Sequence, residues 1–332
     1  MYIAQRKEIE YLNDKKFLNV IETPFVTLEW VKFLEKNQNG EPVLLEIIDE
    51  DTVVAYFVGM IINKFGLKIL GSPFEGWLTP DMGFVKIHDY NIIYALQAVK
   101  IFAFKNLHCL FLQVIDKKIR MSDINDCLPK MASVRILYID NSYEQEKVIQ
   151  NFTKNGRRDV RASSRKGLEF RKVSFDDTFV EKYYHQLEDV FAKQNLKPFY
   201  SIDKLYDLVN ALELIPERVL ALEAYYEGKC VASLFSFGYG EWAYYMGAAS
   251  YREYQKYLPN EGLFWEFMKY WNEQGVKNID MVGYREYKMK YNPELIEIPV
   301  ITFQKYPFLL RFKVFAKTIV MLFRKLKGAI KK

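Results

Sequence analysis

The sequence predicts an α/β protein built from two copies of one unit, each a mixed, mostly antiparallel sheet flanked by helices. Three observations lead to this prediction. The 332 residues suffice for two domains of ordinary size, and half of them are hydrophobic. Apolar, β-branched runs separated by short turns are followed by an apolar pattern at helical spacing and then by another apolar run. This order occurs twice, as expected for a duplicated fold unit.

The first unit begins with three predicted strands. The runs 42–49, 52–62 and 67–73 are rich in β-branched residues and are separated by short turns, so we expect an antiparallel meander. Residues 90–105 have apolar positions at helical spacing, and HCLFLQVI (108–115) is typical of a buried strand.

The second unit repeats this order. Three apolar runs, 218–226, 230–237 and 242–250, precede a predicted helix at 261–275 and a short strand at 278–283. The sequence therefore favours two copies of one α/β unit, although such patterns also arise by chance in α/β proteins.

The helix at 261–275 has recognisable end signals. Asn260 is placed to cap its first turn and Gly275 to end it. The free amides and positive dipole at this N-terminus can hold a carbonyl or a phosphate, and ordinary capping is the alternative.

A helical hairpin is predicted between the units, at 142–167. Ser142 is a candidate N-cap, and Asn155-Gly156 is expected to end the first helix. The second helix is expected to begin near Arg157 and to close at Gly167.

The second arm of this hairpin is strongly basic. Its basic side chains are Lys154, Arg157, Arg158, Arg161, Arg165 and Lys166. The four arginines recur at spacings of three and four, so they can share one helix face. Arginine suits bidentate contacts with phosphate, which favours an anion site. A solvated face that exchanges ion pairs with acidic residues is the alternative.

The charge of the chain is unevenly distributed. Residues 308–332 carry eight basic side chains and no acid, and 151–172 carry eight against two acids. The net charges of these segments are +8 and +6, and the whole chain has a net charge of +5, so the remaining residues together carry −9. Two short basic segments on an acidic body indicate polyanionic partners.

The basic C-terminal tail, 306–332, has an amphipathic helical pattern. Its apolar stripe consists of Phe312, Phe315, Ile319, Phe323, Leu326 and Ile330. The longest uncharged stretch, TIVMLF, has six residues and is too short to span a bilayer. The pattern favours binding to an anionic membrane surface, and docking of the helix on the protein body is the alternative.

Cysteine and histidine are too few and too scattered for several kinds of site. The three cysteines contain no CxxC pair, and the three histidines lie far apart. This spacing supports neither a metal cluster nor a Ser-His-Asp arrangement, so we expect no metal. The first 20 residues are polar and charged, so we expect no signal peptide and a reducing, cytoplasmic location.

Three stretches carry a resemblance to a known family. These are GRRDVRASSRKGLEFRKV (156–173), YKMKYNPE (287–294), and the strands, helix and strand from 221 to 283. Together they resemble the Fem-type transferases of the GNAT superfamily and related acyltransferase-like proteins of polysaccharide gene clusters. The resemblance implies tandem GNAT-like domains at 1–141 and 168–305, on either side of the hairpin.

The resemblance also implies roles for several residues. Lys288 falls on the lysine of the family's F-K-x-x-F-G motif, where it can stabilise an oxyanion or hold the acyl donor, and Tyr287 beside it is a packing or stacking residue. Asp280 is the best-placed carboxylate for a base, and the alternative is an aspartate that bonds a turn. In the loop 71–84, Trp77 is expected to stack a sugar, and Glu75 or Asp81 to accept its hydroxyls; a plain turn-rich loop is the alternative. A surface lysine is the alternative for Lys288.

The acyl donor stays open between aminoacyl-tRNA and acyl-CoA, and no tightly bound cofactor is expected. Acetyl-CoA-dependent relatives hold the pyrophosphate on a glycine-rich turn, but here REYQKYLPNEG (252–262) lacks paired glycines, and Pro259 has no amide hydrogen. The resemblance implies transfer of an aminoacyl or acyl group to an amine of a nucleotide- or lipid-linked cell-envelope precursor, either a peptidoglycan peptide or an amino sugar.

Two alternatives remain at this stage. One is an acetyl-CoA-dependent N-acetyltransferase of polysaccharide biosynthesis, and the other is a non-catalytic protein that binds polyanions or membranes on a decayed transferase fold. In each case we expect a monomer that is cytoplasmic and peripheral on the inner face of the membrane.

Overall fold

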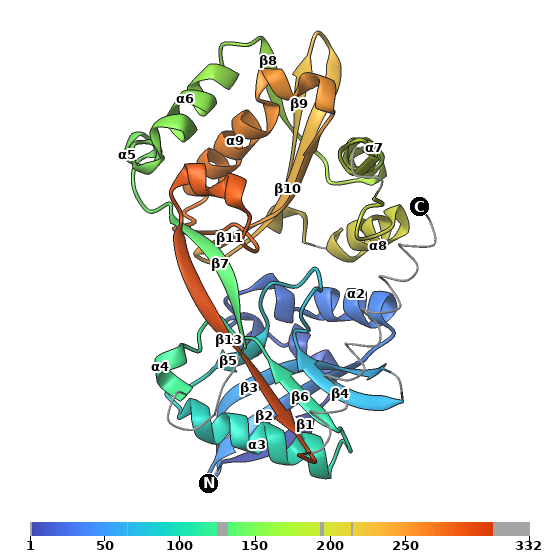
Figure 1. Ribbon diagram of the computed structural model, residues 1–332. Coiled ribbons are helices and arrows are strands. Elements are labelled where there is room, and N and C mark those ends of the chain that lie inside the picture. The colour runs from blue at the N-terminus through green and yellow to red at the C-terminus, as the bar shows by residue number, and fades with distance from the viewer. Residues whose placement is uncertain (1, 65, 125–131, 193–195, 214, 308–332) are drawn as a thin grey trace.

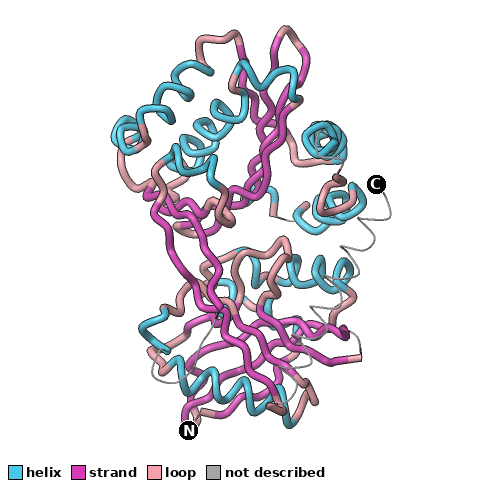
Figure 2. The backbone as a smooth tube through the Cα atoms, in the orientation of Figure 1, coloured by secondary structure: helices cyan, strands magenta, loops and turns pink. Residues whose placement is uncertain are grey.

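A single sheet runs through the whole molecule in the computed structural model, which describes residues 2–64, 66–124, 132–192, 196–213 and 215–307 (Figure 1). Within these ranges the sheet has 13 strands, in the order β1-β2-β3-β4-β6-β13-β7-β12-β11-β10-β9-β8, with β5 paired to β3. Helices pack on the sheet in both halves (Figure 2). The predicted fold class, a mostly antiparallel sheet flanked by helices, is confirmed.

The first unit has the expected order of elements. Strands β2 (Glu41–Asp49), β3 (Thr52–Lys64) and β4 (Leu67–Ser72) form an antiparallel meander. Helix α3 (Ile92–Lys105) follows, and β6 (Phe111–Val114) then pairs in parallel with β4. The other elements of this half are β1 (Ile3–Lys7), α1 (Lys15–Leu18), α2 (Leu28–Gln38), β5 (Gly83–Lys86) and α4 (Met121–Ile124).

The second unit repeats the arrangement. Strands β9 (Val219–Tyr226), β10 (Lys229–Tyr239) and β11 (Trp242–Ser250) form the meander, α9 (Pro259–Glu273) follows, and β12 (Asn278–Asp280) pairs in parallel with β11. The repeat inferred from the sequence is thus present in the topology. The other elements of this half are β8 (Leu168–Val173), α7 (Asp177–Ala192) and α8 (Ile202–Leu212).

Two long strands that the sequence analysis did not identify join the units. Strand β7 (Ala132–Asp140) pairs with β12 and with β13 (Glu294–Gln304). The far end of β13, residues 301–304, pairs with β6 of the first half. Each half therefore contributes its last strand to a shared centre, where the orange and light green ribbons cross in Figure 1. The domain boundaries proposed above stay a prediction.

The halves also share a hydrophobic core. The ring of Phe25 lies edge-on to Tyr244, with 4.7 Å between ring centroids, and Trp30 lies 5.6 Å from Phe237. All four side chains are at most 1% exposed. Because aromatic side chains bury large apolar areas, this contact fixes the first half against β10 and β11.

The helical hairpin exists, but its predicted break was misplaced. Helix α5 (Gln145–Asn151) ends before Thr153, and α6 (Lys154–Ser163) begins directly after it. The Thr153 hydroxyl accepts a hydrogen bond from the Gly156 amide (3.2 Å), so Thr153 is the N-cap and Gly156 lies inside α6. The predicted helix start near Arg157 is wrong for the same reason.

The predicted cap of the helix at 261–275 was also wrong. Leu258, in a left-handed conformation (φ 63°), precedes Pro259, which is the first residue of α9. Asn260 is already helical and its Nδ2 donates to the Ser250 hydroxyl (3.0 Å). Gly275 follows the end of α9 with φ 81°, as predicted. The tail from residue 308 onward lies outside the described residues.

Candidate functional site

The candidate site lies where β11 and β12 separate. The two strands pair at only three positions, ending with Tyr244↔Asp280. Beyond this point the chain turns away through Val282 (φ 49°) and Gly283 (φ 78°), while β11 continues to Ser250. The register opposite β10 also shifts here, so Met246 has no register partner in β10. The two strands therefore no longer pair beyond this point, and we call the region where they separate the transfer slot.

Lys288 lies buried beside this slot. It belongs to a 3₁₀ turn, Glu286–Tyr291, and is 4% exposed. Its Nζ donates to the carbonyl oxygens of Met281, Val282 (3.1 Å) and Gly283 (3.2 Å), which are the residues that leave β12. The Nζ also lies 5.5 Å from the ring centroid of Tyr245 on β11. Lys288 therefore places a positive charge between the separating strands.

Burial lowers the pKa of Lys288 to about 8, because the ammonium loses hydration; Asp280 opposes this shift and Arg285 adds to it. Asp280 is 1% exposed, and its Oδ1 accepts a hydrogen bond from the Val282 amide (2.8 Å). Burial raises the pKa of this carboxyl, and the charge of Lys117 is the main opposing effect. Two of the predicted catalytic residues, Lys288 and Asp280, thus both bond the segment that leaves β12, and each favours the charged form of the other.

Tyr287 behaves differently from its neighbour. Its side chain is 59% exposed, whereas Lys288 is buried, so Tyr287 is available for stacking and does not pack in the core. Its ring centroid lies 6.0 Å from the Lys288 Nζ.

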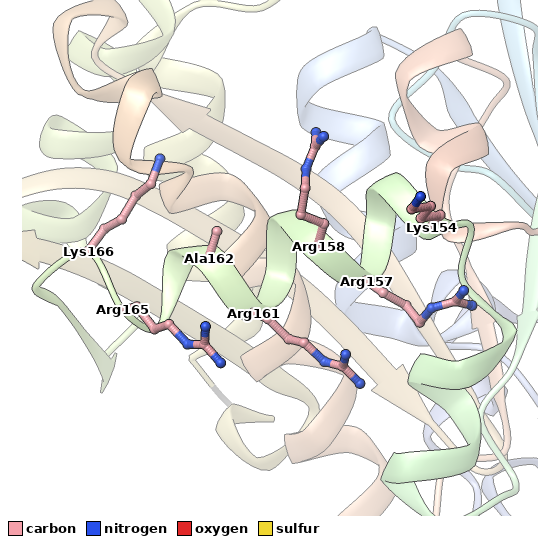
Figure 3. A pocket seen from close by; sticks show the side chains of 7 residues that line it. All are labelled: Lys154, Arg157, Arg158, Arg161, Ala162, Arg165 and Lys166. Atoms are coloured by element: carbon pink, nitrogen blue, oxygen red, sulfur yellow. The ribbon is translucent and has the colours of Figure 1, made fainter.

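The basic side chains of α6, together with Ala162 and with Arg165 and Lys166 just after the helix, line an open groove of about 530 Å³ (Figure 3). Arg157, Arg161 and Arg165 extend in one direction from the helix, and Arg158 and Lys166 extend in the other. The basic side chains therefore line a groove, but Arg158 extends away from Arg157, Arg161 and Arg165, so the four arginines do not share one helix face as predicted.

The members of this groove fall into two groups. Arg157 donates to the carbonyl oxygens at the end of α5, Arg158 pairs with Asp159 (2.9 Å), and Lys166 donates to the Lys256 carbonyl. Lys154, Arg161 and Arg165 are exposed, and none of these side chains makes a hydrogen bond or an ion pair with any described residue. These two guanidinium groups remain available to an external anion.

The N-terminus of α9 is less suited to an anion. Glu261 lies in its first turn and pairs with Lys290, so a carboxylate already occupies the positive end of the helix dipole. Gly262 packs against the Phe170 ring, which lies 2.0 Å from where a Cβ would be. Asn260 Oδ1 is buried and lacks a hydrogen-bond partner among the described residues. A pyrophosphate at this turn would meet the negative charge of Glu261.

The loop 71–84 places its candidate residues in different surroundings. Trp77 is half-buried against Phe74, with ring centroids 4.9 Å apart, and Glu75 is exposed. Asp81 is 1% exposed, and its Oδ2 lies 3.5 Å from the Lys117 Nζ. Asp81 therefore faces the contact between the halves and not the solvent. The sugar-binding role of this loop stays a prediction.

Sequence reasoning missed Lys117, although a signal was present. The run Asp116-Lys117-Lys118 follows β6 after Ile115, and charged residues so near the end of a buried strand are uncommon. Lys117 Nζ donates to the Tyr244 hydroxyl (2.6 Å) and lies 3.7 Å above the Trp242 ring.

Among the described residues, no group of three or more metal-binding side chains occurs, and no helix is long and apolar enough to cross a membrane.

Gly156 connects the basic groove to the transfer slot. A Cβ at this position would lie 2.2 Å from the Lys290 carbonyl oxygen, two residues after Lys288. We expect Gly156→Ala to push α6 away from this turn and to lower the free energy of unfolding by about 1–3 kcal/mol. Chemical denaturation measures the loss, with the exposed neighbour Asn155→Ala as the control. Equal stability of the two variants would contradict this tight contact.

Residues 154–289 match the family model "Acetyltransferase (GNAT) domain". The crystal structure of FemX superposes with a TM-score of 0.68 at 10% identity, covering 90% of this chain and 97% of FemX. The structure of L-PGS from Bacillus licheniformis superposes with a TM-score of 0.55 at 12% identity, covering 94% of this chain and 95% of L-PGS.

A tandem GNAT protein from the clavulanic acid biosynthesis pathway gives a TM-score of 0.51 at 9% identity, covering 92% of this chain and 99% of that protein. None of the curated proteins matches the sequence. At these identities the solved structures establish the fold alone. Residues 154–289 thus match a GNAT acetyltransferase domain, and the chain shares the fold of FemX over nearly its whole length, which confirms the predicted resemblance at the level of the fold.

Proposed function

We propose that this chain is an N-acyltransferase that passes an aminoacyl group from aminoacyl-tRNA to an amine of a cell-envelope precursor. The observation that carries the proposal is the Lys288 ammonium, buried at the point where β11 and β12 of a GNAT domain separate. A fixed positive charge beside this slot stabilises the negative charge that develops on an acyl carbonyl oxygen.

In the proposed reaction the acceptor amine attacks the carbonyl carbon of the aminoacyl ester. The new C–N bond forms, the ester C–O bond breaks, and the proton lost by the amine ends on the released ribose oxygen. Lys288 stabilises the tetrahedral oxyanion between these events, and the slot holds amine and ester close together.

The surroundings of the slot favour a tRNA donor over acyl-CoA. The first turn of α9 carries Pro259 and Glu261, which suit pyrophosphate poorly, whereas the basic groove presents Arg161 and Arg165 to an external polyanion. The fold is also shared with FemX and with L-PGS from Bacillus licheniformis, which fits an acceptor in the cell envelope.

A transfer assay with two donors tests the proposal. Purified protein is incubated with nucleotide-linked and lipid-linked peptidoglycan precursors, and with either a labelled aminoacyl-tRNA pool or labelled acetyl-CoA. We expect label to move from aminoacyl-tRNA to a precursor and none to move from acetyl-CoA. Transfer from acetyl-CoA would contradict the proposed donor. Salt-sensitive binding of tRNA with no transfer from either donor would favour a non-catalytic, polyanion-binding protein.

A further inference from the structure

Lys117 reaches from the first half of the chain to the edge of the transfer slot. It follows β6, and its side chain is 11% exposed. Its Nζ donates to the hydroxyl of Tyr244 on β11, and Tyr244 is the register partner of Asp280 on β12. Because neighbouring register partners in a sheet project from the same face, Asp280 lies on the side of the sheet from which Lys117 approaches.

Asp280 connects this lysine to Lys288. The positive charge of Lys117 is the main influence that lowers the pKa of Asp280 and so favours its ionised form. The negative charge of Asp280 is in turn the main influence that raises the pKa of Lys288 and favours its protonated form. Burial alone would lower the pKa of Lys117, but Tyr244, Asp81 and Asp280 together raise it. Charges of alternating sign, Asp81–Lys117–Asp280–Lys288, therefore extend from the first half of the molecule to the slot.

Other titratable groups near these four residues have their own contacts. Arg285 acts on Lys288, and Tyr138 is the register partner of Asp280 on β7, where its hydroxyl donates to Asn278 (2.9 Å). On the far side of Asp81, Asp116 lies 3.8 Å from the Lys118 Nζ. Of the positive charges that act on Asp280, Lys117 belongs to the first half and Lys288 to the second.

We infer that Lys117 is a positioning residue of the transfer site: it keeps the Asp280 carboxylate ionised and, through it, the Lys288 ammonium charged and held against the carbonyl oxygens that leave β12. This inference rests on the proposed function of Lys288. It gives the first half a part in the reaction, because Lys117, which pairs with Asp81 of its own half, also reaches Tyr244 and Trp242 on β11 at the edge of the slot.

The titration of Lys288 tests this inference independently of transfer. Protein with ¹³C-labelled lysine is titrated by NMR, and the Lys288 Cε signal is assigned by its loss in Lys288→Arg. In Lys117→Met we expect the midpoint of Lys288 to fall, because the Asp280 carboxyl loses its main positive neighbour, ionises less readily and so favours the ammonium less. We expect the alkaline limit of transfer to move down by the same amount. Lys118→Met, which removes the neighbouring charge that faces Asp116, is the control and should move neither.

A double-mutant comparison separates this effect from general loss of structure. Asp280→Asn alone should lower the Lys288 midpoint, and adding Lys117→Met to Asp280→Asn should lower it no further. A folded Lys117→Met with an unchanged midpoint, or equal further shifts in both backgrounds, would overturn the inference. If Lys117→Met does not fold, Lys117→Gln replaces it in the same comparison. Absence of transfer in the native protein with the expected NMR shifts would contradict the proposed function but retain the electrostatic coupling.

Discussion

Replacing Lys288 with methionine is expected to lower the rate of transfer by about 10²–10³-fold, the cost of removing one preorganised group that stabilises an oxyanion. Methionine keeps the length of the side chain and removes the charge and the three donors. The carbonyl oxygens of Met281, Val282 and Gly283 then lose a buried partner, so we also expect a loss of stability. The rate is therefore measured well below the melting temperature of the variant, with its folded fraction checked by circular dichroism.

Lys288→Arg is the matched variant, because arginine keeps the positive charge at all working pH values. In the native protein we expect transfer to decline as the pH rises through about 8, where Lys288 loses its proton. The pKa of Lys288 is about 8 in the folded protein, below the ordinary lysine pKa of 10.5 that applies in the unfolded chain. Between these pH values the unfolded chain binds one more proton, so the contribution of Lys288 to the free energy of unfolding increases as the pH rises. A loss of transfer in this pH range is therefore not caused by Lys288 destabilising the folded protein. A native alkaline limit that persists in Lys288→Arg would contradict the assignment.

The sequence predicted the repeated unit because its strands and helices are locally encoded. The runs that became β2, β3 and β4 are apolar and separated by turns, and the helix at 92–105 keeps its apolar spacing. Strands β7 and β13 were missed because their pairing is non-local. β13 pairs with β6 through residues almost 190 positions apart, such as Ile301↔Val114, and no local pattern contains that information.

The errors at the helix ends have a similar origin. Asn155-Gly156 resembles a helix stop, yet Gly156 is glycine because the Lys290 carbonyl packs against it from a distant turn. Asn260 resembles a cap, yet its amide bonds Ser250 on β11. In both cases a tertiary contact determines the residue type, and local propensity is overridden.

The candidate site was accessible from the sequence only in part. The four arginines between 157 and 165 were identified by their spacing, and α6 contains three of them, while Arg165 follows its end. Lys288 was identified through a family motif, and its burial is supplied by the fold. The link from Lys117 to Asp280 needs both halves in place, since the two residues are more than 160 positions apart in the chain.

The double variant Arg161→Gln, Arg165→Gln is expected to weaken binding of tRNA and to make it less sensitive to salt. These two side chains are exposed and have no partner among the described residues, so their removal should leave the fold intact. Each arginine that contacts a phosphate contributes about one unit to the slope of log K against log salt. The double variant should therefore lose about two units of slope, measured by fluorescence anisotropy across a salt series.

The control is Arg171→Gln, which removes an exposed arginine of β8 that already pairs with Glu169 (2.6 Å) and lies outside the groove. It lowers the net charge by one without touching α6, so an effect of overall charge alone would appear in it at about half the size. Arg158→Gln should have an intermediate effect because Asp159 already neutralises part of its charge. If the double variant and the control bind tRNA alike, the groove does not hold the tRNA donor. If only the double variant loses binding and its transfer rate at saturating donor is unchanged, the groove holds the donor and Lys288 acts in the chemical step.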